Sequence, residues 1–475
     1  MLSDLDKKYP LLLALTLFLG LIVFFWGLGS IELMSLNEGR RALATKEMVT
    51  TGNWFLPHLN GELYLTKPPL LYWVSSTLAI IWGGVNEWTL RLPSALAAIA
   101  VLWMTYLYTF KQSGKWAALF AIQLLIANVS FAMLGRRAEI EMLLTALCIG
   151  SLLSALQYIQ LQSNKIWIYL SYFLLALALM AKGPLVLLFV TLPLIVAAIY
   201  TKDSSIKTVL FSWRGWLIFL VVGLTWYVLV TWQLGFDIWA SIAKKDMLDK
   251  MQGSSAKPIL SYIGWIAVDF ILLVGLFCVR AKGYFKKQTQ KIDQLVLIMA
   301  IIVPLVIFSI FTNKHAKYLL PIYPLIAVLL GLKLNELFET AKISLKKVFV
   351  ILELLLVIGF AVFYALIEPK AYAYRVAAIP AFGNWSSNVN QSNLYAYNNV
   401  DSRLIYYANK PIKVLDKPMV VGKKNSQTPF LLLVESDDLH QIELLADCKI
   451  REFSPYLKKN KTLIVFGFGS ACPQN

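Results

Sequence analysis

Long apolar runs, separated by short charged stretches, fill the first 366 residues of the chain. A helix needs about 20 predominantly apolar residues to cross the hydrocarbon core of a bilayer. The run from Leu11 to Leu28 meets this length, and further runs that approach it lie at 91–110, 115–133, 140–160, 166–181, 183–200, 214–234, 259–280, 293–312, 317–334 and 347–366. The pattern predicts a polytopic α-helical membrane protein with about 11 spans.

The apolar segment 68–82 decides how the loops alternate between the two faces of the membrane. Lys7 and Lys8 precede the first span, so the positive-inside rule places the N-terminus in the cytoplasm. Counting 68–82 as a span would put Lys111 and Lys115 outside and reverse every later loop. We therefore interpret it as a juxtamembrane helix on the outer face. No small-residue cleavage pattern follows the first run, which favours a signal anchor.

The tail, 367–475, has a different pattern. Apolar runs at 393–397, 429–434 and 463–468 alternate with polar segments such as 436–443, which predicts a small α/β domain on the outer side of the membrane. Cys448 and Cys472 lie in this tail and are able to form a disulfide if the tail faces an oxidising compartment. The predicted organisation is a transmembrane domain at 1–366, with its first outer loop at 30–68, and a periplasmic domain at 367–475.

Composition supports the membrane interpretation. Hydrophobic residues make up 58% of the chain and the net charge is +17, a balance that is not typical of a soluble globular protein. The basic residues recur in short runs between apolar segments, which topology and anionic lipid explain better than nucleic acid does. We expect no nucleic-acid partner.

The first outer loop carries the densest charge. Ser35 and Glu38 fit a capping box and predict that a helix begins here. Beyond Gly52 the sequence turns into a loop that returns to the membrane through Lys67 and two prolines. A charged surface between two apolar segments indicates a functional site that faces water.

The sequence of this loop, NEGRRALATKEMVTTGNWFLPHLNGELYLTKPPLLYW, resembles the first periplasmic loop of GT-C glycosyltransferases that use polyprenyl-phosphate sugars. The resemblance is to the aminoarabinose (lipid A) transferases and the protein mannosyltransferases. It extends through GRRAEIEMLLT, the AKGP turn and NKHAKYLLPIYPLIAVLLG. It implies a GT-C fold in the bacterial inner membrane and transfer of a sugar with inversion.

Such a transfer needs a carboxylate to accept the proton of the acceptor hydroxyl. The candidates are Glu38 and Glu141, in the first and second outer loops. In the family an acidic pair opens the first loop, but here it reads Asn37–Glu38, and an amide cannot serve as the base. Glu38 is alternatively the capping partner of Ser35, and Glu141 a favourable charge at a helix N-terminus. Since Glu139 and Glu141 lie two apart on an expected helix, we predict that at most one faces the site.

Cations are needed to stabilise the departing phosphate. Lys67 matches the lysine of the family's KP motif, and Lys250 stands where relatives carry a phosphate-binding arginine; Arg40 is a third candidate. Snorkelling at the interface is the alternative role for Lys67. Lysine retains the charge of arginine but loses its bidentate fork.

No cofactor or metal is expected. Some relatives hold a metal with a glutamate and a histidine, where this chain has Thr66 and Lys245. His315, Lys317 and Tyr318 begin a span at the outer face and are candidates for contact with the lipid phosphate or the acceptor. A plain interfacial cluster is the alternative.

The leading hypothesis is a membrane glycosyltransferase, acting as a monomer, that moves a sugar from undecaprenyl phosphate to lipid A, another glycolipid or a protein. The second class is a lipid-linked sugar transporter or flippase, which the absence of two related halves disfavours. A catalytically silent relative that binds the lipid carrier is the third, because Asn37 replaces an acid.

Overall fold

The computed structural model describes residues 2–472 except 163, 243, 245–256, 271–291, 341–342, 390–392 and 459. The chain forms two compact units. The first, which we call the helical unit, comprises Met1–Trp26, Leu65–Val74 and Arg91–Tyr364; the second, the loop–tail unit, comprises Gly27–Tyr64, Ser75–Leu90 and Ala365–Asn475. The predicted domain boundary at residue 366 stays a prediction.

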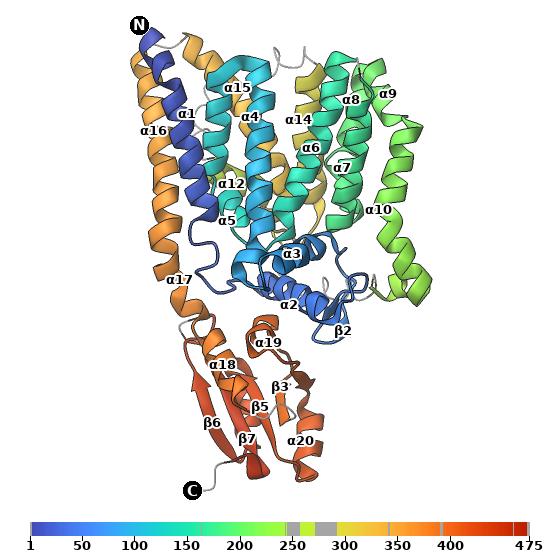
Figure 1. The fold of residues 1–475 in the computed structure, drawn as a ribbon, viewed down its shortest axis with the longest axis vertical. Helices are drawn as coiled ribbons and strands as arrows, with labels where there is room; N and C mark the ends of the chain where they lie inside the picture. The colour runs from blue at the N-terminus through green and yellow to red at the C-terminus, as the bar shows by residue number, and fades with distance from the viewer. Residues whose placement is uncertain are drawn as a thin grey trace. The chain divides into compact units, whose positions relative to one another are not determined.

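The helical unit is a bundle of helices that run side by side (Figure 1). Among the described residues, eight helical segments are long and apolar enough to cross a membrane, and the predicted total of about 11 spans stays a prediction. The elements are α1 (Leu2–Phe25), α4 (Glu87–Ile126), α5 (Val129–Gly135), α6 (Ile140–Leu161), α7 (Ile166–Lys182), η1 (Pro184–Leu188), α8 (Thr191–Thr201), α9 (Ser204–Leu210), α10 (Trp213–Leu234), α12 (Ser261–Asp269), α14 (Ile292–Ile310), η2 (Ala316–Ile322), α15 (Tyr323–Thr340) and α16 (Ile343–Val362).

Two predicted spans, 91–110 and 115–133, occupy α4 and α5. The helix α4 is interrupted at Gly114, whose φ of 82° is accessible to glycine at little cost. Next to this break, Lys115 forms an ion pair with Asp6 of α1 at 2.8 Å. The break therefore turns the chain at the charged boundary that the sequence predicted.

The segment predicted as juxtamembrane is the helix α3 (Leu70–Ile81), which has 12 residues. At 1.5 Å per residue it is about 18 Å long, whereas the hydrocarbon core is about 30 Å thick. Its length agrees with the interpretation that it does not span.

The helices α1 and α16 lie side by side (Figure 1).

Arg136, at the end of α5, donates hydrogen bonds to the carbonyls of Val23 and Trp26 at the end of α1, the second at 2.9 Å. Its guanidinium also lies 4.9 Å from the ring centroid of Tyr364 (η3, Phe363–Ile367). A cation at the carbonyl end of a helix is favourable, so Arg136 stabilises this corner of the bundle.

The loop–tail unit contains the helix expected at the start of the first loop. The helix α2 (Leu36–Thr51) begins after Ser35, whose side chain accepts the Glu38 N–H, and ends at Gly52 with a φ of 70°. The Ser35 half of the predicted capping box is confirmed, whereas the Glu38 carboxylate accepts the N–H of Met34, one residue before the N-cap. Two short strands, β1 (His58–Leu59) and β2 (Glu62–Leu63), follow as a hairpin through Asn60 and Gly61.

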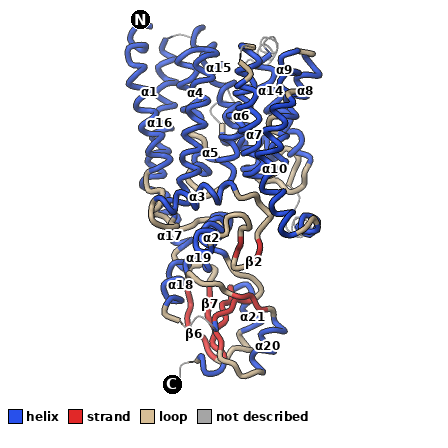
Figure 2. The backbone as a smooth tube through the Cα atoms, turned by 45° about the vertical axis from the view of Figure 1, so that its right-hand side comes forward, coloured by secondary structure: helices blue, strands red, loops and turns tan. Residues whose placement is uncertain are grey.

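The tail folds around a five-stranded sheet of order β4-β3-β5-β7-β6 (Figure 2). The pairs β4–β3 and β3–β5 are parallel, and β7 pairs antiparallel with both β5 and β6. The strands are β3 (Leu394–Tyr397), β4 (Lys413–Leu415), β5 (Phe430–Glu435), β6 (Cys448–Phe453) and β7 (Leu463–Phe468). The helices are α17 (Glu368–Val376), α18 (Ala378–Ser387), α19 (Ser402–Ala408), α20 (Lys417–Asn425) and α21 (Leu439–Ile442), with short turns η5 (Ser436–Asp438) and η6 (Gly469–Ala471).

Both faces of this sheet are buried. Leu431 and Leu433 of β5 join one core with residues of α18 and α19, whereas Phe430 and Leu432 join the other with Val420 of α20. Because successive residues of a strand point to opposite faces, a strand covered on both sides is apolar throughout. This explains why β5 and β7 were recognisable as continuous apolar runs.

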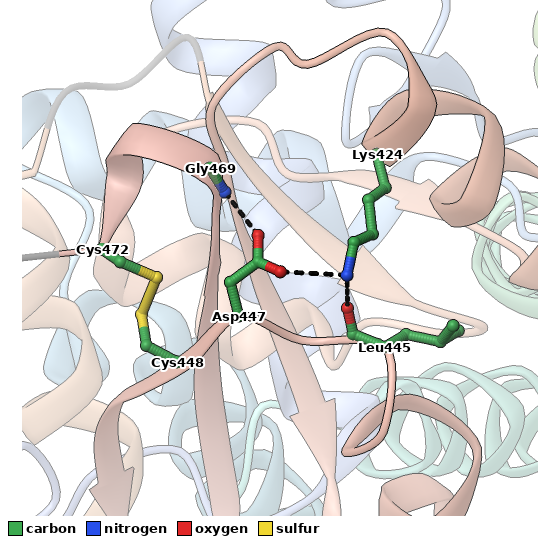
Figure 3. Close-up of a disulfide and its surroundings, with 6 residues drawn as sticks. All are labelled: Lys424, Leu445, Asp447, Cys448, Gly469 and Cys472. Atoms are coloured by element: carbon green, nitrogen blue, oxygen red, sulfur yellow. Dashed lines mark hydrogen bonds and ion pairs between the residues drawn. A yellow bond between two sulfur atoms is a disulfide. The ribbon is translucent and has the colours of Figure 1, made fainter.

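Cys448 and Cys472 form a disulfide with their Cα atoms 6.0 Å apart. Figure 3 shows that Asp447 lies beside this bond and accepts the Gly469 N–H at 2.7 Å. Asp447 also pairs with Lys424 at 2.9 Å. The disulfide and the Gly469 hydrogen bond fasten the 469–472 turn to the start of β6, and the ion pair ties Lys424 of α20 to the same place.

Candidate functional site

Four charged side chains meet in the helical unit. Lys317 Nζ lies 3.2 Å from Glu139 Oε2 and 3.7 Å from Glu141 Oε1. Lys182 Nζ lies 3.2 Å from the same Glu141 oxygen. Both carboxylates are only 6% exposed, and the two lysines are 14% and 23% exposed. Charges this deeply buried are retained when they are paired, and their convergence indicates a site.

Helix ends position these groups. The last residue of α7 is Lys182, and Glu141 belongs to the first turn of α6. Lys317 follows His315, where η2 begins. Cations at helix C-termini and carboxylates at helix N-termini are both favoured by the helix dipole. The site is therefore assembled where α6 begins, α7 ends and the 315–318 segment begins.

The prediction that at most one of Glu139 and Glu141 enters this site is wrong. The helix begins at Ile140, so Glu139 is not helical but is the N-cap residue, with an extended backbone at φ −122° and ψ 144°. The helical rotation between the two positions does not apply there. Both carboxylates consequently reach Lys317.

Tyr318 and His315 lie beside these charged side chains. Lys182 Nζ lies 5.0 Å from the Tyr318 ring centroid, and the His315 ring meets Tyr318 edge-on with centroids 5.1 Å apart. Burial, followed by the charges of Lys257 and Lys317, lowers the pKa of His315 below its ordinary value. His315 is therefore a neutral imidazole at pH 7, able to donate and to accept hydrogen bonds.

The segment that follows Lys67 packs against the same helix ends. Leu71 forms a buried cluster with Ile140 at the start of α6 and Ala181 at the end of α7, and Leu70 packs onto it. Glu141 and Lys182 are the next residues along these two helices. Pro68 and Pro69 restrict the chain between Lys67 and this anchor. The structure therefore brings the Lys67 segment to the end of the bundle that holds the cluster.

Two further lysines lie beside the 315–318 segment. Lys257 Nζ donates to the Lys314 carbonyl at 2.8 Å, and Lys314 Nζ donates to the Lys257 carbonyl at 3.1 Å. Lys314 is 2% exposed, and its charge is satisfied by backbone oxygens. These reciprocal bonds link the residue before His315 to Lys257. Lys250 lies outside the described residues.

Glu38 belongs to the loop–tail unit and has a structural position there. It is fully buried, and its Oε2 accepts the Met34 N–H at 2.8 Å. Glu38 therefore has a role in fixing the start of α2, through the N–H of Met34 rather than through that of the N-cap residue Ser35. On the same turn Asn37 is partly exposed and Arg40 is exposed, so their side chains are accessible to solvent within this unit.

The residues that the structure describes contain no group of three or more His, Cys, Asp or Glu side chains suited to hold a metal. His58 and His440 belong to the loop–tail unit and His315 to the helical unit. The expectation of a metal-free site stays a prediction.

Sequence reasoning missed Lys182 as a member of the cluster. Its signal was the AKGP turn, in which a lysine ends an apolar helix immediately before glycine and proline. A charge at this position is either an interfacial anchor or a partner for a buried carboxylate. The sequence alone does not reveal which carboxylate would meet it.

Two family descriptions match the chain. Residues 66–228 match the dolichyl-phosphate-mannose-protein mannosyltransferase family, and residues 257–403 match the Alg9-like mannosyltransferase family. The first match includes Lys67, Glu141 and Lys182, and the second includes the 315–318 segment. Both parts of the cluster therefore lie within regions shared with glycosyltransferases.

The fold is that of a solved transferase. The crystal structure of ArnT from Cupriavidus metallidurans bound to undecaprenyl phosphate superposes with a TM-score of 0.81 at 16% identity, over 97% of this chain and 99% of that one. The predicted fold class, a polytopic GT-C-type helical protein with a small C-terminal α/β domain, is confirmed. The structural likeness shows a GT-C-type membrane fold.

In sequence the chain is similar to aminoarabinose transferases. It is 24% identical to the undecaprenyl phosphate-alpha-4-amino-4-deoxy-L-arabinose arabinosyl transferase 2 of Proteus mirabilis over 65% of this chain and 57% of that protein. A protein of Aquifex aeolicus is 26% identical over 92% of this chain and 99% of its own length. The chain thus spans little more than half of the Proteus transferase and nearly all of the Aquifex protein.

Proposed function

We propose that the protein is a membrane glycosyltransferase that moves a sugar from undecaprenyl phosphate to a hydroxyl of an envelope acceptor. The acceptor class we favour is lipid A or a related glycolipid, because the Proteus and Aeromonas relatives are named as aminoarabinose transferases that use undecaprenyl phosphate. The multi-pass helical unit would place the reaction at the inner membrane, with the cluster and the tail on the periplasmic side.

One observation carries the proposal: Glu139, Glu141, Lys182 and Lys317 converge at one end of the bundle, where the Lys67 segment packs. Transfer from a lipid phosphate requires a carboxylate near the acceptor hydroxyl and cations near the departing phosphate. The cluster supplies both from neighbouring positions. A transporter would instead favour charges at the midplane of two related halves.

The residues take the following roles in this proposal. Glu141 accepts the proton of the acceptor hydroxyl while its oxygen bonds to the sugar anomeric carbon and the bond between that carbon and the phosphate oxygen breaks. Lys67 and Lys317 neutralise the phosphate that leaves, and Tyr318 and His315 donate hydrogen bonds to its oxygens or to the acceptor. Lys250, Asn37 and Arg40 are included on the resemblance alone.

Glu141 is preferred over Glu38 as the base because of what each carboxylate already does. Glu38 is fully buried and engaged by the Met34 N–H, whereas Glu141 Oε1 lies 3.2 and 3.7 Å from the ammonium groups of Lys182 and Lys317. A lysine that leaves Glu141 for the phosphate would free the carboxylate as negative charge arrives.

The direct test is transfer from radiolabelled undecaprenyl-phosphate sugars to envelope lipids by membranes that contain the protein. Lys67→Ala should abolish labelling, whereas Lys165→Ala, an exposed lysine that precedes α7, should leave it unchanged. EDTA should leave transfer intact. Labelling that persists in Lys67→Ala would contradict the phosphate role, and absence of labelling with every donor would contradict the transferase assignment.

A further inference from the structure

The first turn of α2 is fixed by a residue of the tail. Arg403, in α19, is 1% exposed. Its Nη1 donates to the carbonyls of Met34 and Leu33, at 3.0 and 3.3 Å. The Met34 N–H in turn donates a hydrogen bond to the Glu38 carboxylate. A continuous set of hydrogen bonds therefore connects a side chain of the tail with the turn that begins α2.

The guanidinium itself is held rigidly. Arg403 Nε lies 3.1 Å from both oxygens of Asp401, and its Nη2 lies 2.5 Å from Oδ2. Tyr456 Oη adds a hydrogen bond to Asp401 at 3.3 Å. A bidentate arginine–carboxylate pair fixes direction as well as charge. Nη1 is consequently aimed at the two carbonyls rather than free to move.

Glycine at position 39 permits this contact. A Cβ atom there would lie 2.5 Å from Arg403 Cγ and 3.0 Å from its backbone nitrogen. The α2 backbone therefore rests directly on α19, at a distance that no other residue allows. Lys46, about two turns further along α2, donates a hydrogen bond to the Tyr406 carbonyl at 2.8 Å. The helix α2 is therefore held at a second point.

We propose that Arg403 is a positioning residue for the transfer reaction. It sets the orientation of the first turn of α2, on which Asn37 and Arg40 are presented, through the carbonyls of Leu33 and Met34. Asp401 keeps the guanidinium aligned. The tail would thus be a component of the substrate-binding machinery rather than an appended domain. The effect on turnover rests on the proposed function, whereas the effect on the turn does not.

The experiment compares Arg403→Met with wild type by two measurements. Hydrogen exchange of peptides that cover 33–39 should become at least about ten-fold faster, and by a larger factor than in the sheet strands β5 and β7, because the turn loses its direct support whereas the sheet responds only to the unpaired Asp401 carboxylate. The turnover number should fall by about 10- to 100-fold with a small change in donor KM, as expected when groups are misplaced rather than removed. Arg403→Lys, which retains the charge and one donor direction, should recover part of both losses.

Arg451→Met is the matched control, because Arg451 lies on the edge strand β6 and is exposed; it should match wild type. Equal loss of protection in the turn and in the sheet would show that Arg403 is only structural and would overturn the proposal, as would unchanged exchange at 33–39. A wild type without transfer activity would contradict the proposed function, and the exchange result would still decide whether Arg403 orders the turn.

Discussion

Lys317 contacts Glu139 and Glu141 at once, at 3.2 and 3.7 Å. One ammonium group thus separates two carboxylates that would otherwise face each other in a poorly solvated site. Lys317→Met should lower transfer at least about ten-fold because the site loses a cation and gains unbalanced negative charge. Initial rates at saturating donor would measure this. Lys333→Met, on α15, is the control that should retain activity.

Glutamine substitutions should distinguish between the two candidate bases, Glu141 and Glu38. Glu141→Gln should abolish turnover while leaving thermal unfolding close to wild type. Glu38→Gln should retain turnover and lower the free energy of unfolding by about 1 kcal/mol, because it weakens the helix cap. Turnover that survives both substitutions would refute a carboxylate base at either position.

Stability should depend on pH through His315. Its pKa in the folded protein lies below the ordinary value of 6.5, so the unfolded chain binds more protons as the pH falls. The free energy of unfolding should therefore decrease as the pH falls from about 6.5 toward the lowered pKa, and reach a new level below it. Melting temperatures of wild type and His315→Gln at pH 5 to 8 test this. The melting temperature of the variant should depend less steeply on pH than that of wild type, and the same pH dependence in both would contradict the contribution of His315.

Replacing Glu353 should stabilise the bundle. This residue of α16 is fully buried, and among the described residues neither of its carboxylate oxygens has a hydrogen-bond partner. Glu353→Met removes a group whose burial costs about 1–3 kcal/mol, at similar volume. Thermal unfolding in detergent should shift upward, whereas Glu336→Met, a partly exposed residue paired with Lys333, should change little. A lower stability of Glu353→Met would indicate that the carboxyl serves a bound group.

The disulfide gives a test of topology. Mass analysis without reduction should recover peptides in which Cys448 is joined to Cys472, and Cys448→Ser should lower tail stability by about 3 kcal/mol for a loop of this size. Reporter fusions at Asp401 and Lys111 should report the periplasm and the cytoplasm, respectively. The reverse pattern would overturn the proposed orientation.

Sequence patterns predicted the elements that are buried on every side. The expected span 140–160 corresponds to α6 (Ile140–Leu161), and the expected strand 463–468 is β7. The strands β4 and β6 were not predicted, because both lie at sheet edges and expose residues without regular alternation.

Side-chain convergence was less predictable. The sequence did predict that His315, Lys317 and Tyr318 lie at the start of a helix. It also predicted Glu141 as a candidate for the site. Two pairings depend on contacts between segments that are distant in the sequence. Lys182 pairs with Glu141, and Arg403 donates to the carbonyls of Leu33 and Met34. No local pattern encodes such pairs, since either partner alone resembles an ordinary surface charge.

The distance along the chain between Leu33 and Arg403, 370 residues, also has a consequence for synthesis. A ribosome that adds about 5 to 20 residues per second needs roughly 20 to 70 s to cover this interval. During that time the first loop has been made but its docking partner has not. The start of α2 therefore acquires its final support only when translation is nearly complete, so a chain interrupted before Arg403 would leave the bundle inserted and this turn without its anchor.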